Sequence, residues 1–330
     1  MLGVPPNPLL AYADTSRNPL WGSAVPFGGW LAPPPPPPPK ALVGNLRLRI
    51  WDVEHGACAM FHHIWNGIGG RLAMIDSGDC ADWSPSKFIR YGLNRDVLNY
   101  LFVTNADQDH MSDLQGLWDH GVGVQVWHRN PSLNATAFRH IKEKGGPLTG
   151  DAKRYLANLT TMNLPVAEPF NLHMAGITSA LFWNEYPAFT NTNDLSLVVF
   201  IKYAGFKILF PGDLEKAGWL ALFNRRDFLL ELADTTILVA SHHGRENGYC
   251  PLLFSYCHPQ AVVMSDKSIV HDTQFMSQIY RNEVIKHHPI GVCVSTTGKR
   301  RHVLTTRRDG HIQFEVDGQG NFTITTEKFG

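Results

Sequence analysis

The stretch Leu101–His110, with the sequence LFVTNADQDH, constrains the fold and the chemistry of this chain more than any other. An apolar and β-branched run from Tyr100 to Thr104 stops abruptly at polar residues, which predicts a short buried strand. Donors of the kind that bind metal ions follow at once: Asn105, Asp107, Asp109 and His110. Carboxylates held close together repel each other, so such a cluster favours a bound cation. The alternative is that the two aspartates cap a helix beginning near Met111.

Two later segments repeat this arrangement. Phe210–Glu215 (FPGDLE) and Val239–Gly244 (VASHHG) each continue a strand-like apolar run and present a carboxylate or imidazoles just before a turn. Loops that follow strands converge at one edge of a sheet, where binding sites commonly form. The three strand ends together therefore favour a metal site over simple helix capping.

Several motifs, taken in order, carry a resemblance to a known family. They are Trp51–Ala57 (WDVEHGA), Met74–Gly78 (MIDSG), Thr104–His110, Asn193–Val199 (NDLSLVV), Leu209–Glu215, Ser241–Gly244 and Arg307–Ile312. Between about Leu46 and Phe329 the chain resembles the metallo-β-lactamase superfamily, and within it the soluble hydrolase domain of ComEC-type DNA-uptake proteins. The resemblance implies an α+β fold, the αββα four-layer sandwich. The alternation of predicted strands and helices alone would indicate only α/β or α+β.

The resemblance also implies the ligands of a firm metal site. Asp109 and His110 match the Asp-His pair that holds one ion in the superfamily, and Asp213 matches the aspartate that bridges two ions. His243 is the expected last ligand, with His242 as the alternative because spacing alone does not decide which imidazole points inward. Two carboxylates and two imidazoles suit zinc, manganese or iron. Asp76 resembles an aspartate that supports the metal centre, and otherwise is a turn former.

A second, weaker metal site departs from the superfamily pattern. Asn105 and Asp107 stand where two histidines are usual, and Asn193 stands at a later histidine position. Together with Asp213 these residues offer only oxygen ligands, which favour magnesium, manganese or calcium over zinc. We therefore expect one firmly bound ion and a second that is loose or arrives with substrate.

Catalytic and substrate-binding residues are expected around this centre. Asp109 and His271 are the candidate catalytic residues, and His271 resembles a histidine that contacts phosphate or protonates a leaving group. A capping role for His271 before a helix is the alternative. Arg245 and Lys299 are candidate phosphate contacts. The basic run Lys299–His302 is otherwise explained as a solvated turn.

A metal-activated water acting on a phosphodiester in DNA is the leading hypothesis for function. A bound metal lowers the pKa of its water and stabilises charge that develops on a phosphoryl oxygen. One alternative is a catalytically degenerate binding module, suggested by the loss of histidine at position 105. Another is a hydrolase of an ester, a lactone or a small cyclic phosphodiester.

Composition indicates how the chain divides into domains and which kinds of partner it can bind. Residues 1–45 form a proline-rich arm containing Pro33–Pro39, which favours an extended conformation, and residues 46–330 are predicted to form one hydrolase domain. Trp21, Phe27 and Trp30 suggest that the arm docks on its own domain or on a protein partner. Lys plus Arg and Asp plus Glu each number 29, so a nucleic acid would have to bind a local basic patch.

The chain is expected to be cytoplasmic and not membrane-bound. It has no apolar run long enough to span a bilayer and no secretory signal pattern. Its five cysteines include no Cys-x-x-Cys pair, which fits reduced thiols.

The predicted elements are few but specific. Strands are expected at Leu46–Trp51, Ala57–Ile64, Leu72–Ile75, Tyr100–Thr104, Thr236–Ala240, Ala261–Met264 and Gly291–Ser295, with hairpins Leu195–Tyr203/Phe206–Phe210 and Ile312–Val316/Phe322–Thr326. Helices are expected at Met111–His120, Asn134–Lys144, Asp151–Leu159, Glu215–Phe223, Arg225–Leu232 and Thr273–Tyr280.

Overall fold

The structure is a computed structural model, and it describes residues 44–162, 170, 174–267 and 271–328. The chain divides into two units, Met1–Lys40 and Ala41–Gly330, and every described residue belongs to the second. Residues 1–43 of the predicted proline-rich arm lie outside the described ones, whereas Asn45, its predicted last residue, begins a strand. Among the described helices, none is both long enough and apolar enough to cross a bilayer.

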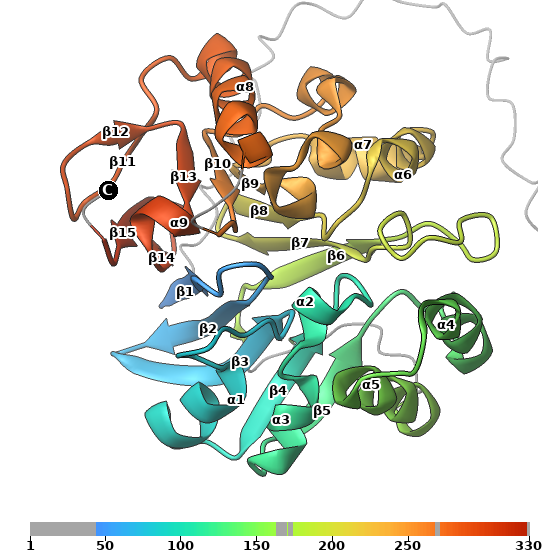
Figure 1. Cartoon of the computed structure of the whole chain (residues 1–330). Coiled ribbons are helices and arrows are strands. Elements are labelled where there is room, and N and C mark those ends of the chain that lie inside the picture. The colour runs from blue at the N-terminus through green and yellow to red at the C-terminus, as the bar shows by residue number, and fades with distance from the viewer. Residues whose placement is uncertain (1–43, 163–169, 171–173, 268–270, 329–330) are drawn as a thin grey trace, which may run out of the picture. The chain divides into compact units, whose positions relative to one another are not determined.

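The first of two large sheets contains both the first and the last strands of the described chain (Figure 1). Its strand order is β15-β14-β1-β2-β3-β4-β5. The strands are β1 (Asn45–Ile50), β2 (Ala59–Trp65), β3 (Ile68–Ile75), β4 (Val97–Phe102), β5 (Gly123–His128), β14 (Ile312–Val316) and β15 (Phe322–Thr326). The β3–β4 and β4–β5 pairs are parallel and the other pairs are antiparallel. The three strands predicted to open the domain are present as β1, β2 and β3, and they pair antiparallel.

The second large sheet has the order β13-β10-β9-β8-β7-β6. Its strands are β6 (Thr178–Phe182), β7 (Val198–Tyr203), β8 (Phe206–Phe210), β9 (Ile237–Val239), β10 (Ala261–Met264) and β13 (Val303–Thr305). The predicted hairpin across Ala204-Gly205 is present, with Tyr203 paired to Phe206. A separate ribbon pairs β11 (Val292–Cys293) with β12 (Arg300–Arg301).

Helices cover the outer faces of both sheets, which gives four layers (Figure 1). The helices on the side of the seven-stranded sheet are α1 (Pro85–Lys87), α3 (Leu114–Asp119), α4 (Ala135–Lys142) and α5 (Gly150–Thr161); those on the other side include α6 (Lys216–Leu222), α7 (Arg226–Leu232) and α8 (His271–His287). One apolar core lies between the sheets, where Leu48, Phe102, Ile208 and Phe314 are buried. Two further cores lie between each sheet and its helices. The predicted α+β, αββα four-layer sandwich is therefore confirmed.

The helix predicted at Met111–His120 is interrupted. It consists of α2 (Gln108–Met111) and α3, and the break falls at Ser112 and Asp113. The Asp113 amide donates to the Ser77 carbonyl at 2.9 Å, so it leaves the helical hydrogen-bond ladder. This bond ties the start of α3 to the segment that follows β3.

The three strand ends that carry the candidate ligands belong to both sheets. β4 lies in the seven-stranded sheet, whereas β8 and β9 lie side by side in the other. The expectation of a single sheet edge was wrong, because the two sheets pack face to face and bring their strand ends to one rim of the sandwich. Figure 1 labels α2, which follows β4, at the level where the two halves meet.

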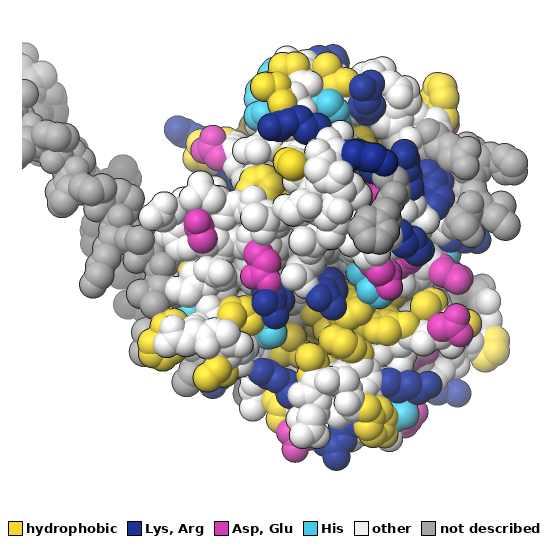
Figure 2. Space-filling model, turned by 90° about the vertical axis from the view of Figure 1, so that its left-hand side faces the viewer, with side chains coloured by type: hydrophobic (Ala, Val, Ile, Leu, Met, Phe, Trp, Pro, Cys, Tyr) yellow, Lys and Arg dark blue, Asp and Glu magenta, His cyan; other side chains and the backbone are white. Residues whose placement is uncertain are grey.

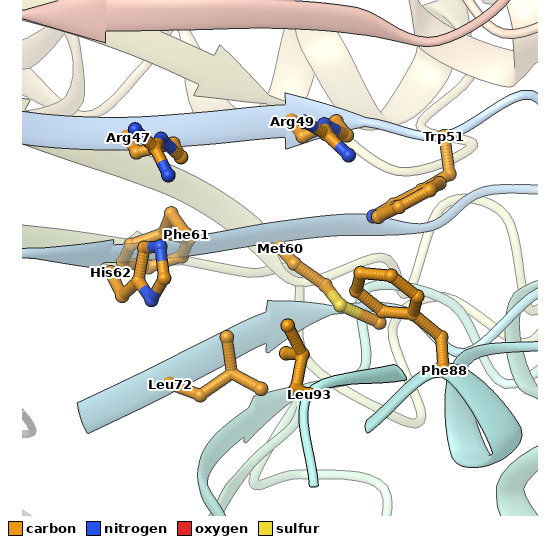
Figure 3. Close-up of a pocket in the computed structure, with 9 residues that line it drawn as sticks. All are labelled: Arg47, Arg49, Trp51, Met60, Phe61, His62, Leu72, Phe88 and Leu93. Carbon is orange, nitrogen blue, oxygen red and sulfur yellow. The ribbon is translucent and has the colours of Figure 1, made fainter. Parts of the chain in front are cut away.

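The outer face of the seven-stranded sheet carries a hollow of 110 Å³ beside Phe88 (Figure 3). In β1 the apolar residues face the central core, so Arg47 and Arg49 point outward. His62 of β2 is paired with Arg47 across the two strands, and Arg49 lies two residues further along the same face of the hollow (Figure 3).

Candidate metal centre

Four side chains from the two sheets meet at the rim of the sandwich. Ligand atoms of Asp109, His110, Asp213 and His243 all lie within 4.8 Å of one another. His110 Nε2 is 2.9 Å from Asp213 Oδ1, and His243 Nε2 is 3.2 Å from Asp109 Oδ2 and 3.6 Å from Asp213 Oδ1. Tetrahedral ligands bound at about 2.1 Å stand about 3.4 Å apart. The observed spacing therefore fits one shared ion.

Both imidazoles present the same nitrogen to the cluster. His243 Nδ1 lies 3.1 Å from the Ser265 carbonyl oxygen, which can only accept, so Nδ1 carries the donated hydrogen. His110 Nδ1 lies 2.9 Å from Asp76 Oδ2. In each ring the second nitrogen, Nε2, faces the carboxylates of the cluster. Metal-ligating histidines are commonly oriented in this way by an acceptor on the other nitrogen.

The polar atoms at the centre of the cluster are unsatisfied within the described part of the chain. His110 Nε2 and Asp213 Oδ1 are buried and form an ion pair at 2.9 Å, but their geometry is not that of a hydrogen bond and neither atom has another hydrogen-bond partner among the described residues. Buried polar groups without partners are costly, and a bound ion would satisfy both atoms at once. The residues present therefore fit a divalent metal.

The carboxylates of the cluster stabilise a positive charge at its centre, as the pKa shifts of its members show. Burial would lower the pKa of His110, but the Asp213 and Asp76 carboxylates outweigh burial and raise this pKa well above its usual value. Burial would raise the pKa of Asp109, yet the hydrogen bond with His243 and the charge of His110 hold it below its usual range. The pKa of Asp213 is lowered for similar reasons, chiefly by His110 against the effect of burial. A metal ion and a proton therefore compete for His110 Nε2.

An unusual backbone conformation places His243. His242 and His243 have φ values of 49° and 55°, and Gly244 follows with φ of 77°. Consecutive non-glycine residues in the left-handed region are uncommon and cost free energy, and such strain is concentrated at functional sites. The His242 amide donates to the Gly212 carbonyl at 3.1 Å, which ties this turn to the segment holding Asp213.

Gly78 allows three motifs of the sequence to pack closely. A Cβ atom at this position would lie 2.7 Å from the carbonyl oxygens of both Ala57 and Asp109. The Ala57 amide also donates to the Asp109 carbonyl at 3.2 Å. The Trp51–Ala57 and Met74–Gly78 motifs thus support the backbone that carries Asp109.

His242, the alternative ligand, lies at the edge of the cluster. Its Nε2 is 3.8 Å from Asp213 Oδ2 and 3.2 Å from an Arg245 nitrogen, while its Nδ1 is 3.5 Å from Glu215 Oε1. His243, and not His242, is grouped with the other three potential ligands. The inward-pointing imidazole is therefore His243.

The residues expected to form a weaker oxygen-rich site lie together but bind one another. Asn105 Nδ2 donates to Asp107 Oδ2 at 3.2 Å and to Asn193 Oδ1 at 3.0 Å. Asp107 forms an ion pair with Lys142 and accepts a hydrogen bond of 2.6 Å from the Thr192 hydroxyl. The Asp107 carboxylate is thus already neutralised, and Asn105 Oδ1, like Asp213 Oδ1, is a buried oxygen of this group without a hydrogen-bond partner in the described structure. A second ion here stays a prediction.

An open cleft of 540 Å³ exposes the centre to solvent. Its lining residues are His55, Asp79, Asp107, Gln108, Asp109, Ser112, Asn193, Asp213, His242 and Arg245. Arg245 lies between His242 and His55. The Nε2 atom of His55 is 3.3 Å from an Arg245 nitrogen. His55 Nε2 is also 3.4 Å from Asp109 Oδ2. Sequence reasoning did not single out His55, although it lies inside the Trp51–Ala57 motif.

Of the two other predicted residues, one lies away from this cleft and the side chain of the other is not described. Lys299 is exposed on the turn between β11 and β12 and does not line the cleft. His271 begins α8, but its side chain lies outside the described part of the structure. Its role in catalysis stays a prediction.

Comparisons with known proteins give only distant likenesses. No family model and no curated protein matches the chain. Among solved structures, the chain is similar to a protein described as a metal-dependent hydrolase from Parabacteroides distasonis ATCC 8503, with a TM-score of 0.40 and 10% identity over 78% of this chain and 93% of that one. It is also similar to CmlA, a diiron β-hydroxylase from Streptomyces venezuelae, with a TM-score of 0.43 and 10% identity over 84% of this chain.

The E377D mutant of that β-hydroxylase gives a TM-score of 0.44 at 10% identity over 81% of this chain. The alignments span about half of the two β-hydroxylase chains, 53% and 54%. These likenesses are too distant to carry an argument about activity, so the chemistry of the site rests on its own geometry.

Proposed function

We propose that this protein is a metal-dependent hydrolase that cleaves phosphodiester bonds in DNA. The observation that carries the proposal is the meeting of Asp109, His110, Asp213 and His243 within 4.8 Å of one another, with both carboxylates lining an open cleft. The resemblance of the ordered motifs to ComEC-type hydrolase domains supports DNA as the substrate. Zinc or manganese suits the two carboxylates and two imidazoles, and manganese or magnesium would suit the weaker oxygen-rich site.

Different residues of the cleft have different roles in the proposed hydrolysis. When bound, the metal supplies a Lewis acid that makes water a nucleophile near neutral pH. Asp109 is the least buried of the four, with 23% of its side chain exposed, and its Oδ2 can accept a hydrogen bond from an attacking water. Arg245, at the cleft wall, offers guanidinium donors to a phosphate oxygen.

Cleavage of labelled DNA across a series of manganese, zinc and magnesium tests the proposal. We expect cleavage with added manganese, and its loss in the Asp109→Ala and His110→Ala proteins because each removes a ligand. Asp119→Ala, which removes an exposed carboxylate of α3, is the matched control and should cleave normally. Unchanged cleavage by Asp109→Ala would assign the activity to a contaminant.

A catalytically degenerate binding module is the second candidate. It is favoured by Asn105 at a position where histidine is usual, and by the Lys142 ammonium that already neutralises Asp107. The metal content of the purified protein separates the two candidates. About one or more ions per chain supports the enzyme, and absence of tightly bound metal supports the module.

A further inference from the structure

A second cleft, lined by arginines, lies apart from the metal centre. It has a volume of 320 Å³ and lies between α8, β12, β13 and α9 (Thr306–Asp309). Five of its lining residues are arginines: Arg281, Arg300, Arg301, Arg307 and Arg308. Its lining residues include no aspartate, no glutamate and no phenylalanine, tyrosine or tryptophan, and His302 is the one residue among them with a ring.

Two of the five arginines are balanced by buried carboxylates. Arg301 pairs with Asp309 at 3.2 Å, and Arg307 pairs with Asp266 at 3.1 Å. Both aspartates are almost fully buried, so these two pairs fix the wall of the cleft and add little net charge. The charge that faces a ligand comes from the other three arginines.

Arg281, Arg300 and Arg308 are exposed, and within the described residues none has a carboxylate partner. They come from three different elements, α8, β12 and α9. The cleft therefore carries three uncompensated positive charges on a chain whose formal net charge is zero. Figure 2 views the side of the sandwich that carries β11 to β13, and Lys and Arg side chains gather over its upper half with few Asp or Glu side chains among them.

The arginine cleft is joined to the metal centre by a short segment. The Ser265 carbonyl accepts the hydrogen bond from His243 Nδ1, and the next residue, Asp266, pairs with Arg307. Thr306, next to Arg307, holds Asp266 in place. The Thr306 hydroxyl lies 3.0 Å from the Asp266 amide nitrogen and 3.2 Å from the Asp266 carbonyl oxygen. Arg307 of the cleft wall is thus linked, through Asp266, to the residue that orients a candidate metal ligand.

We propose that the arginine cleft binds the phosphate backbone of single-stranded nucleic acid, a site separate from the metal centre. Guanidinium groups match phosphate oxygens in geometry and charge, and such contacts hold a strand without reading its sequence. The cleft has no phenylalanine, tyrosine or tryptophan on which bases could stack, so we expect its main contacts to be with phosphates. The inference rests on the proposed function in one respect, because it takes a nucleic acid as the substrate class.

Binding is measured by fluorescence anisotropy with a labelled single strand of about 16 nucleotides, a length at the upper end of single-site sizes. The full chain is used in EDTA, which prevents cleavage. The Arg281→Ala, Arg300→Ala, Arg308→Ala triple variant should bind at least about tenfold more weakly at low salt, because three phosphate contacts are lost. The slope of log affinity against log salt should fall by about 2, since each contact to a single strand contributes about 0.7.

A charge-matched triple variant provides the control. Arg90→Ala, Arg139→Ala and Arg226→Ala remove exposed arginines from other elements and should leave affinity and salt slope nearly unchanged. Thermal unfolding verifies that each triple variant folds. If the cleft variant fails to fold, Arg281→Gln, Arg300→Gln and Arg308→Gln are tested singly, and each should still weaken binding. Equal binding by the cleft variants and the control overturns the inference.

Further measurements separate this inference from the proposed function and from other anions. Loss of DNA binding in the cleft variant, with no cleavage by the wild type in any metal, leaves the inference standing and overturns only the hydrolase. Metal-dependent cleavage with normal binding by the cleft variant overturns only the inference. The inference is also overturned if inorganic phosphate alone binds the cleft as tightly as the labelled strand does. Binding to phosphatidylserine vesicles in place of the strand overturns it as well.

Discussion

Asp76 shows how one residue outside the cluster controls a metal ligand. Its Oδ1 accepts the Thr104 amide at 2.6 Å, and its Oδ2 accepts the Thr104 hydroxyl at 2.5 Å and lies 2.9 Å from His110 Nδ1. Its backbone is left-handed, with φ of 58°, a conformation that aspartate tolerates better than most residues. The carboxylate therefore fixes both the end of β4 and the orientation of the His110 ring.

The Asp76→Asn variant should bind metal about 10- to 100-fold more weakly, the usual cost of losing such an orienting partner. The amide has one acceptor oxygen where the carboxylate has two, so it cannot serve both Thr104 and His110. Isothermal titration calorimetry of the apo-protein with manganese measures this change in metal affinity.

Asp113→Asn is the matched control for this change. Asp113 is also a buried aspartate, but it bonds Ser86 and not a cluster residue. Its variant should keep wild-type metal affinity. Wild-type affinity in a folded Asp76→Asn protein would show that the carboxylate does not orient His110.

At the scale of elements, four strands have the predicted bounds: two that are buried on both faces, and the half-buried hairpin partners Ile312–Val316 and Phe322–Thr326. Phe206–Phe210 and Ala261–Met264 have the predicted bounds, because their apolar runs are packed between a sheet face and helices. β5 and β6 were not identified. Each forms one edge of its sheet and is partly exposed, so its pattern is weak and its strand conformation depends on the neighbouring strand.

The residues of the candidate site, like the strands, could be predicted only in part from the sequence. Asp109, His110 and Asp213 could be found because they directly follow apolar strands, and His243 because it lies in a distinct turn motif. Lys142 could not, since it lies on α4, 35 positions from the Asp107 that it neutralises. Such a contact arises from the packing of α4 and leaves no signal in the local sequence.

The β1–β2 region makes a pH-dependent contribution to stability through His62. Burial, together with the nearby charges of Arg95, Arg47 and Arg49, lowers the pKa of His62 to about 4. Figure 3 shows the His62 ring in the same hollow as Arg47 and Arg49. The unfolded chain binds this proton near pH 6.5, so stability is complete above that pH and falls as the pH drops toward 4.

The His62→Gln variant should lose less stability on acidification than the wild type. The difference between pH 7 and pH 4 should reach about 2–3 kcal/mol, the free energy of a pKa shift of this size. Urea unfolding at a series of pH values measures it. His140→Gln, which removes an exposed histidine of α4, is the control, and an identical pH profile for His62→Gln and the wild type would contradict the prediction.

For the described part of the molecule as a whole, the sheet topology and the metal centre both join distant segments. β14, near the end of the chain, pairs with β1 near the beginning of the described residues. Asp109 and His110 follow a strand of one sheet, whereas Asp213 and His243 follow strands of the other. A bound ion would therefore link the two sheets directly, in addition to the apolar core between them.

Metal binding should accordingly raise the unfolding temperature of the protein as one cooperative unit. At a free metal concentration of about 1,000 times Kd, linkage adds about 4 kcal/mol to the free energy of unfolding. For a domain of this size that corresponds to a rise of about 8 °C in Tm. Calorimetry with manganese and with EDTA measures the shift. Asp213→Asn should show almost no shift, because the Asp213 carboxylate faces both imidazoles, at 2.9 Å from His110 Nε2 and 3.6 Å from His243 Nε2. If metal shifted only part of a divided transition, the two sheets would unfold separately and the ion would not link them.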